Sequence, residues 1–146
     1  MKFVHLAALG ALLSQLAVQS AFAEPAAQVQ TRCFQFSGRP AKLLQLRLID
    51  TDDDNETAFV RYVGSKAWIP LVLSRSKETP MADSGHSQLD EEWLEVVHDQ
   101  VGGRYLLSMQ GAEVNSFEYV ARKDGARTEF KLAPTPRGVD PCESRK

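Results

Sequence analysis

The chain has 146 residues, and its 17 Lys and Arg are nearly balanced by 19 Asp and Glu, for a formal net charge of −2. Such a weakly acidic chain with evenly mixed charges is not typical of a nucleic-acid-binding protein, which concentrates positive charge. No stretch has the basic amphipathic pattern of a helix that lies on a membrane surface. The length suits one domain with a single modest core.

Residues 1–23 have the pattern of a signal peptide. Lys2 supplies a positive charge, the run 3–18 is mostly apolar, and Ala-Phe-Ala at 21–23 is the small-x-small sequence that signal peptidase recognises. The apolar run is short for a membrane-spanning helix, although an uncleaved anchor is the alternative interpretation. We therefore expect a periplasmic or secreted protein that begins at Glu24 and carries no membrane anchor.

Two cysteines, Cys33 and Cys142, lie near opposite ends of the expected mature chain. In an oxidising compartment such a pair is expected to form a disulfide, with a reactive thiol as the alternative. The sequence thus predicts a flexible lead-in at 24–32, a β domain at 33–142 closed by this disulfide, and a short tail at 143–146.

The first half of the domain alternates apolar and polar residues, as β-strands with one buried face do. The expected strands are Cys33–Phe36, Lys42–Ile49, Ala58–Val63 and Ala67–Leu73. The leucines of the second segment would also suit a helix, but their strict alternation with polar residues favours a strand. Pro70 has no backbone N–H to donate, so it predicts a sheet edge or a bulge in the fourth strand.

Two polar stretches interrupt this pattern. Residues 74–90 contain Pro, Gly and several Ser without any period, and we expect a disordered or functional excursion. The acidic run 50–56 is similar to the start of a calcium loop, but the positions that need Gly and Glu hold Asn55 and Arg61. A solvated turn is the better interpretation of that run.

The stretch from Glu91 to Leu132 organises the rest of the chain. Its expected strands are 91–97, 104–110, 115–122 and 126–132, with breaks at 98–103, 111–114 and 123–125. Asp124-Gly125 predicts a tight hairpin turn, because both residue types tolerate the positive φ that such a turn needs. About eight short antiparallel strands predict an all-β fold, either a small barrel or a sandwich.

The sequence offers little that is typical of catalysis. It has no Gly-x-Ser-x-Gly elbow and no Cys left over to pair with a His, so we expect neither an enzyme nor a cofactor. His86 and His98 are too few donors for zinc, and we expect no metal. A carboxylate pair for glycoside hydrolysis could come from four acidic residues, Asp90, Glu91, Glu92 and Glu95.

Aromatic residues belong to the core or to a binding face. The phenylalanines expected in the core are Phe34, Phe36, Phe59, Phe117 and Phe130. The Trp and Tyr residues fit either role, since exposed Trp and Tyr often anchor interfaces: Trp68, Trp93, Tyr62, Tyr105 and Tyr119.

The strongest candidate for a binding site is the turn expected at Val101–Tyr105. Adjacent glycines let a backbone approach a partner closely, and Arg and Tyr are frequent at interfaces. The candidate partner-binding residues are Gly102, Gly103, Arg104, Tyr105 and Tyr119.

This turn resembles the Ser-Gly-x-x-Tyr loop of the periplasmic and membrane-bound inhibitors of c-type lysozyme. Gly102-Gly103-Arg104-Tyr105 supplies Gly-x-x-Tyr, with Val101 in place of Ser. The family's second motif, Tyr-x-x-x-Thr-Lys-Gly, is partly matched by residues 119–125, where Lys123 and Asp124 replace Thr-Lys. The resemblance implies a small exported β-barrel with a terminal disulfide that inserts this loop into a lysozyme cleft.

We therefore expect an exported protein-binding module, an inhibitor or immunity-type partner of a lysozyme-like or other cell-wall hydrolase. A periplasmic barrel that binds a small apolar ligand is the alternative. A hydrolase that uses the clustered carboxylates is a third hypothesis.

Overall fold

The structure is a computed structural model that describes residues 27–51, 56–82, 85–135, 139 and 142–143. The expected signal peptide at 1–23 and the centre of the acidic run, residues 52–55, lie outside these described residues. No helix in the described part of the chain is long and apolar enough to cross a bilayer.

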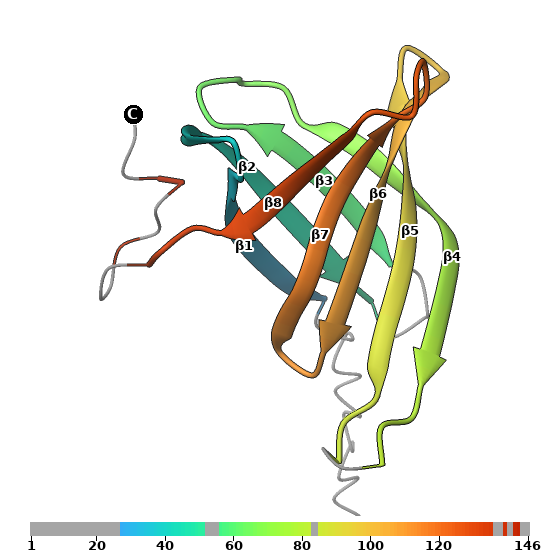
Figure 1. Ribbon diagram of the computed structural model, residues 1–146. Coiled ribbons are helices and arrows are strands. Elements are labelled where there is room, and N and C mark those ends of the chain that lie inside the picture. The colour runs from blue at the N-terminus through green and yellow to red at the C-terminus, as the bar shows by residue number, and fades with distance from the viewer. Residues whose placement is uncertain (1–26, 52–55, 83–84, 136–138, 140–141, 144–146) are drawn as a thin grey trace, which may run out of the picture.

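The described residues form a closed antiparallel barrel in which each strand pairs with the next in sequence and the last returns to the first (Figure 1). Its strands are β1 Gln28–Phe36, β2 Arg39–Asp50, β3 Thr57–Tyr62, β4 Ile69–Thr79, β5 Gln88–Val97, β6 Gln100–Gln110, β7 Glu113–Ala121 and β8 Arg127–Leu132. The β1–β2, β3–β4, β5–β6 and β7–β8 connections lie at one end, which we call the upper end as in Figure 1, and the β6–β7 turn lies at the lower end. The all-β prediction is confirmed, and closure decides for the barrel over the sandwich.

The interior of the barrel is filled by side chains from alternate positions of the strands. The buried cluster consists of Phe34, Leu44, Leu46, Ala58, Val60, Leu71, Trp93, Tyr105, Leu107, Phe117 and Phe130. The prediction that Phe59 belongs to this core was wrong. Its neighbours Ala58 and Val60 are fully buried in the interior, so strand alternation places the half-buried Phe59 on the outer face.

The pairing of β1 with β8, which closes the barrel, is short. Their pairing covers residues 34–36 and 130–132, so neither the lower part of β1 nor the lower part of β7 has a paired strand on that side among the described residues. Arg32 spans this opening, because its Nη1 donates to the carbonyl of Ala112 at 2.8 Å. At the lower end the wall between β1 and β7 is therefore bridged by a side chain and not by strand pairing.

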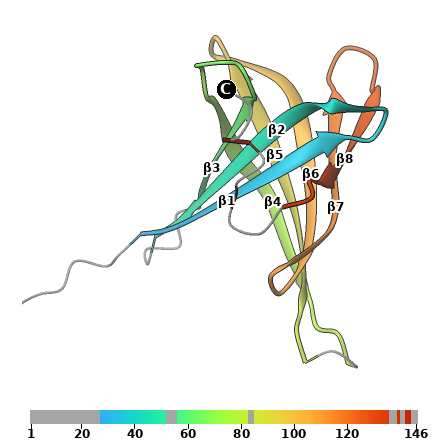
Figure 2. The same ribbon diagram turned by 90° about the vertical axis from the view of Figure 1, so that its left-hand side faces the viewer.

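Several strand boundaries differ from those expected. Residues 28–32, expected in a flexible lead-in, form the start of β1. The polar interval 74–90 is largely strand, since β4 continues to Thr79 and β5 begins at Gln88. In Figures 1 and 2 this β4–β5 hairpin extends past the rest of the barrel at its lower end. Its polar composition reflects the fact that it has no core to face there.

Pro70 lies near the start of β4 in a barrel whose strands all have two neighbours, so β4 is not an edge strand, and the bulge expected as the alternative lies further along it, between Leu73 and Arg75. The proline is tolerated because it precedes Leu71, where the pairing of β4 with β5 begins.

Two turns also differ from the prediction. The β5–β6 turn is His98-Asp99, whose φ angles of 49° and 60° are those of a tight two-residue hairpin, and Gln100–Gly103 belongs to β6. At the β7–β8 connection Gly125 has a positive φ of 69° and Asp124 does not. Asp124 instead accepts a hydrogen bond from the backbone N–H of Ala126 at 3.0 Å, so this connection is a longer loop.

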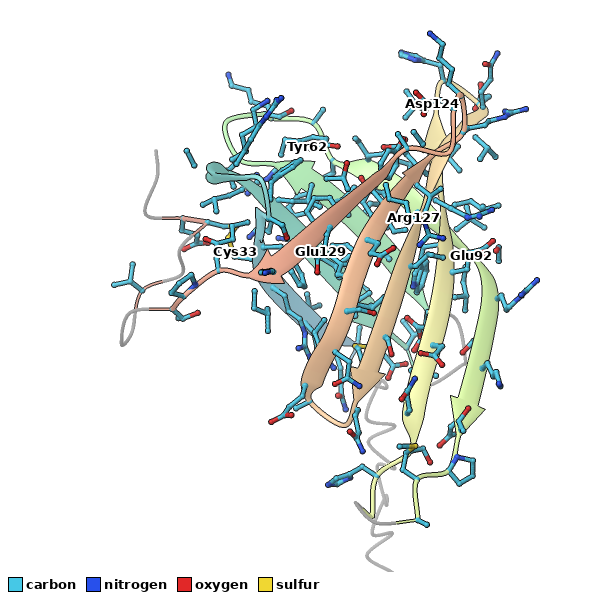
Figure 3. The ribbon with its side chains drawn as sticks, viewed as in Figure 1. Cys33, Tyr62, Glu92, Asp124, Arg127 and Glu129 are labelled. Atoms are coloured by element: carbon cyan, nitrogen blue, oxygen red, sulfur yellow. A yellow bond between two sulfur atoms is a disulfide. The ribbon has the colours of Figure 1, made fainter. Side chains whose placement is uncertain are left out.

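Cys33 and Cys142 form the predicted disulfide, which ties the chain after β8 to the outer face of β1. The two cysteines pack in a small buried cluster with Leu43 and Ala133. Figure 3 shows Cys33 on the side of the barrel where this segment lies. The bond is consistent with an oxidising compartment, as expected for an exported protein.

Candidate functional site

The segment Gly102-Gly103, expected in a loop, lies within β6 in the barrel wall. A Cβ at Gly102 would lie 2.5 Å from Oε2 of Glu95, and a Cβ at Gly103 would overlap the hydroxyl and ring of Tyr119. These two side chains are held together below the glycines, since Tyr119 donates its hydroxyl to Oε2 of Glu95 at 2.9 Å. Burial and this carboxylate raise the pKa of Tyr119. The glycines make room for an interior hydrogen bond.

Tyr105, predicted from the sequence as a partner contact, lies in the interior of the barrel. The residue is 0% exposed. Its ring packs against those of Phe117 and Tyr119, with centroids 5.6 Å and 4.9 Å away. Tyr119 is half-buried beside it and also points inward. The neighbour Arg104 is exposed on the outer face, because adjacent strand residues face opposite sides.

Replacing Gly103 by Ala is expected to lower the free energy of unfolding by about 1–3 kcal/mol, because the added methyl overpacks against Tyr119. Urea unfolding measures the change. The matched control is Gly38→Ala, where a Cβ meets nothing within 4 Å, and a change under about 0.5 kcal/mol is expected. Combining Gly103→Ala with Tyr119→Ala should remove most of the Gly103 effect, and simple additivity of the two would contradict this packing.

A groove of about 320 Å³ lies on the outer face between the bases of the β5–β6 turn and the β7–β8 connection. Leu94, Val101 and Val120 supply its apolar surface, and Arg104 and Arg122 supply positive charge. Gly103 and Arg104, two of the residues predicted from sequence, are thus part of this groove, whereas Tyr105 and Tyr119 support it from inside.

The two arginines of the groove differ in how they are held. Arg104 lies 4.0 Å from Glu92 and keeps 48% of its side chain exposed, so this surface ion pair contributes little to stability. Arg122 donates through Nη1 to the carbonyl of Val101 at 3.0 Å, which joins the two sides of the groove. Figure 3 places Glu92 on β5 and Asp124 at the tip of the β7–β8 connection above the groove.

Sequence reasoning missed Leu94, Val120 and Arg122. The strand register brings Val72, Leu94, Arg104 and Val120 into one row across the outer face of β4 to β7. Val72 and Val101 are 54% and 36% exposed, so the apolar surface extends beyond the groove onto β4. The available signal was the presence of apolar residues on the strand face opposite the core. Grouping these residues into one surface also required the pairing registers of the β4–β5, β5–β6 and β6–β7 hairpins.

A second hollow, of about 190 Å³, lies at the lower mouth, with Leu48, Leu89, Met109, Glu56 and Glu91 among the residues that line it. Glu91 is 5% exposed, and one of its oxygens accepts a hydrogen bond from the indole N–H of Trp93 at 2.9 Å. Burial raises the pKa of Glu91 to about 7, and the nearby Glu56 adds to this rise, while the Trp93 hydrogen bond opposes it.

This raised pKa makes the stability dependent on pH. Because Glu91 titrates near 4.5 in the unfolded chain and near 7 in the barrel, its contribution is fully present below about pH 4.5 and is lost as the pH rises to 7. Glu91→Gln keeps an acceptor for Trp93 without the charge. It should be more stable than the parent chain at about pH 8, by an amount on the order of 2 kcal/mol after allowance for solvent screening.

Denaturant unfolding between about pH 4 and pH 8 measures this effect. The control is Glu129→Gln on the exposed face of β8, which should follow the parent curve. A Glu91→Gln variant that loses stability at high pH as the parent does would contradict the assignment to Glu91.

The four carboxylates considered for hydrolysis lie on both faces of β5. Glu91 and Glu95 face inward, near Trp93 and Tyr119 respectively, while Asp90 accepts a hydrogen bond from Ser108 at 2.7 Å on the outer face. That bond is the main cause of the lowered pKa of Asp90. Strand alternation therefore divides the four carboxylates between the two faces, with Glu91 and Glu95 inward and Asp90 and Glu92 outward.

Trp68, one of the aromatics left open between core and surface, lies between two arginines. The guanidinium carbons of Arg47 and Arg61 are 4.4 Å and 4.5 Å from its ring centroid. Arg61 also donates to the side-chain oxygen of Gln45 at 2.6 Å. Among the described residues no three His, Cys, Asp or Glu side chains are grouped in a way that could hold a metal ion.

Comparison with known proteins found no family model, no curated protein and no solved structure that matches this chain. The resemblance to lysozyme inhibitors therefore stays a prediction.

Proposed function

We propose that the chain is an exported protein-binding module that inhibits a cell-wall-degrading enzyme or protects against one. The observation that carries the proposal is the groove on the outer face of β5 to β7, where Arg104 and Arg122 lie beside Leu94, Val101 and Val120. Arginine is enriched at protein interfaces, and the exposed Val101 and half-buried Leu94 give the groove an apolar surface beside it.

The charge of the groove suggests what it binds. Glycoside hydrolases that cut the cell wall carry a pair of Asp or Glu residues around the scissile bond, so their clefts are acidic. The two guanidinium groups complement such a cleft, and the projecting turns beside them, His98-Asp99 and the β7–β8 connection, are placed to enter it. In this proposal the partner contacts Arg104 and its outward-facing neighbours, and not Tyr105 as the sequence suggested.

The alternative function, a barrel that holds an apolar ligand at its centre, is less well supported. Trp93, Tyr105, Phe34 and Phe117 are at most 1% exposed and occupy that space. A central ligand would have to displace these side chains, which a barrel of this size uses as its core.

Isothermal titration of the oxidised domain against c-, g- and i-type lysozymes tests the proposal. We expect one class to bind, and we expect Arg104→Glu to weaken that binding at least about tenfold. Arg75→Glu is the matched control, because Arg75 is also exposed and lies opposite the same Glu92 in the strand register but does not line the groove. Equal loss of affinity in both variants would show that the groove is not the binding surface.

A further inference from the structure

The lower mouth of the barrel combines a partly open hollow, an apolar patch on a polar lining and a buried carboxyl group. Leu48, Leu89 and Met109 line the hollow together with Glu56 and Glu91. The indole of Trp93 fixes the side chain of Glu91 from the core side. The site is built from β1, β2, β5 and β6 and the residue before β3, and β2 and β6 are paired on both sides along most of their length.

The charged groups around Glu91 are mainly acidic. Asp50 from β2 and Glu56 before β3 line the same hollow, and Glu78 of β4 pairs with Leu89 across the β4–β5 hairpin. Arg32 from β1 supplies the opposing charge, but its guanidinium donates to the carbonyl of Ala112 and to the side-chain oxygen of Gln30. A negatively charged ligand would meet repulsion here, whereas a cation would meet complementary charge.

We propose that this mouth binds a small primary amine with an apolar body, whose ammonium group is accepted by Glu91 and Glu56 and whose carbon chain lies on Leu48, Leu89 and Met109. The site is separate from the groove at the upper end, and the inference does not depend on the proposed inhibitor function.

The size and chemistry of the hollow define this ligand class. Its volume of about 190 Å³ is below the range of drug-sized ligand pockets, so the ligand is a short chain rather than a lipid. A buried carboxylate has lost the water that stabilises its charge. A cationic hydrogen-bond donor offsets this loss better than a neutral one. Binding of an ammonium group to ionised Glu91 also releases the proton that this residue otherwise holds near neutral pH, so affinity should rise with pH.

The probes are n-hexylamine, n-hexanol and n-hexanoate, added to the full oxidised domain at about pH 8, where Glu91 is ionised. The indole N–H resonance of Trp93 reports binding directly, because it is bonded to Glu91. We expect the amine to shift this resonance in a saturable way and to bind at least about tenfold more tightly than the alcohol or the carboxylate. Amine affinity should also fall as the pH is lowered toward about 6.

The Glu91→Gln variant should keep the hydrogen bond to Trp93 and lose amine binding at least about tenfold. Glu92→Gln is the matched control, since Glu92 is the next residue and faces outward, bonded to Ser74. The proposal is overturned if hexylamine and hexanol bind equally, if Glu91→Gln binds the amine as the parent does, or if no probe saturates the Trp93 shift. Tighter binding of an Nα-acetyl-lysine amide than of hexylamine would assign the mouth to a protein lysine instead.

Discussion

Tyr105→Ala is expected to lower the free energy of unfolding by about 3–5 kcal/mol. The side chain is fully buried and packs against Phe117, Tyr119 and Phe130, so its removal leaves a cavity in the middle of the barrel. A loss of this size is a large fraction of the free energy of unfolding of a domain of this length. The melting temperature of the variant should therefore also be clearly lower.

Arg104→Ala provides the control for this prediction, because it changes the adjacent residue on the opposite face of the same strand. It should alter stability by less than about 1 kcal/mol. Chemical denaturation of both variants measures the difference. If Tyr105→Ala were as stable as the parent chain, Tyr105 would have to lie in an exposed loop, as the sequence alone suggested.

Replacing both Cys33 and Cys142 by Ala is expected to cost about 4–5 kcal/mol in the chain-entropy account of disulfides. The cysteines are 109 residues apart, so the bond closes nearly the whole barrel and strongly restricts the unfolded chain. Loss of the bond also frees the segment after β8 from its cluster with Leu43 and Ala133.

Unfolding of the parent domain with and without a reducing agent tests this prediction independently. Reduction should destabilise the parent to about the level of the double Ala variant and should leave that variant unchanged. A double variant that matches the oxidised parent in stability would show that the disulfide does not constrain the unfolded state of this chain.

The sequence predicted the fold well wherever local alternation decides it. Phe34, Leu44, Leu46 and Leu107 repeat with period two along their strands, and each lies in the interior. The prediction failed for Phe59, because it followed the residue type and not the alternation with Ala58 and Val60 on either side.

The turns were harder to predict, because glycine has more than one use. Gly102-Gly103 signalled a break, yet both residues lie in a strand, where they accommodate Glu95 of β5 and Tyr119 of β7 on the two neighbouring strands. The actual turn at His98-Asp99 contains no glycine and uses residues that tolerate positive φ less readily. A contact between distant strands cannot be seen in a local sequence pattern.

The groove depends on such contacts even more strongly. Arg104 was predicted as a contact residue from its place beside the glycines, but Leu94 and Val120 join it through the pairing of β5, β6 and β7. The lower mouth likewise brings Glu91 to Leu48 across the barrel. Neither arrangement follows from residues close in sequence.

The most direct test of the proposed function is the rate at which c-, g- and i-type lysozymes lyse a peptidoglycan suspension as the oxidised domain is added. The proposal predicts that lysis by one class stops near an equimolar ratio, and that Arg104→Glu restores lysis while Arg75→Glu does not. Unchanged lysis by all three classes at a large excess of domain would contradict the assignment to lysozyme inhibition.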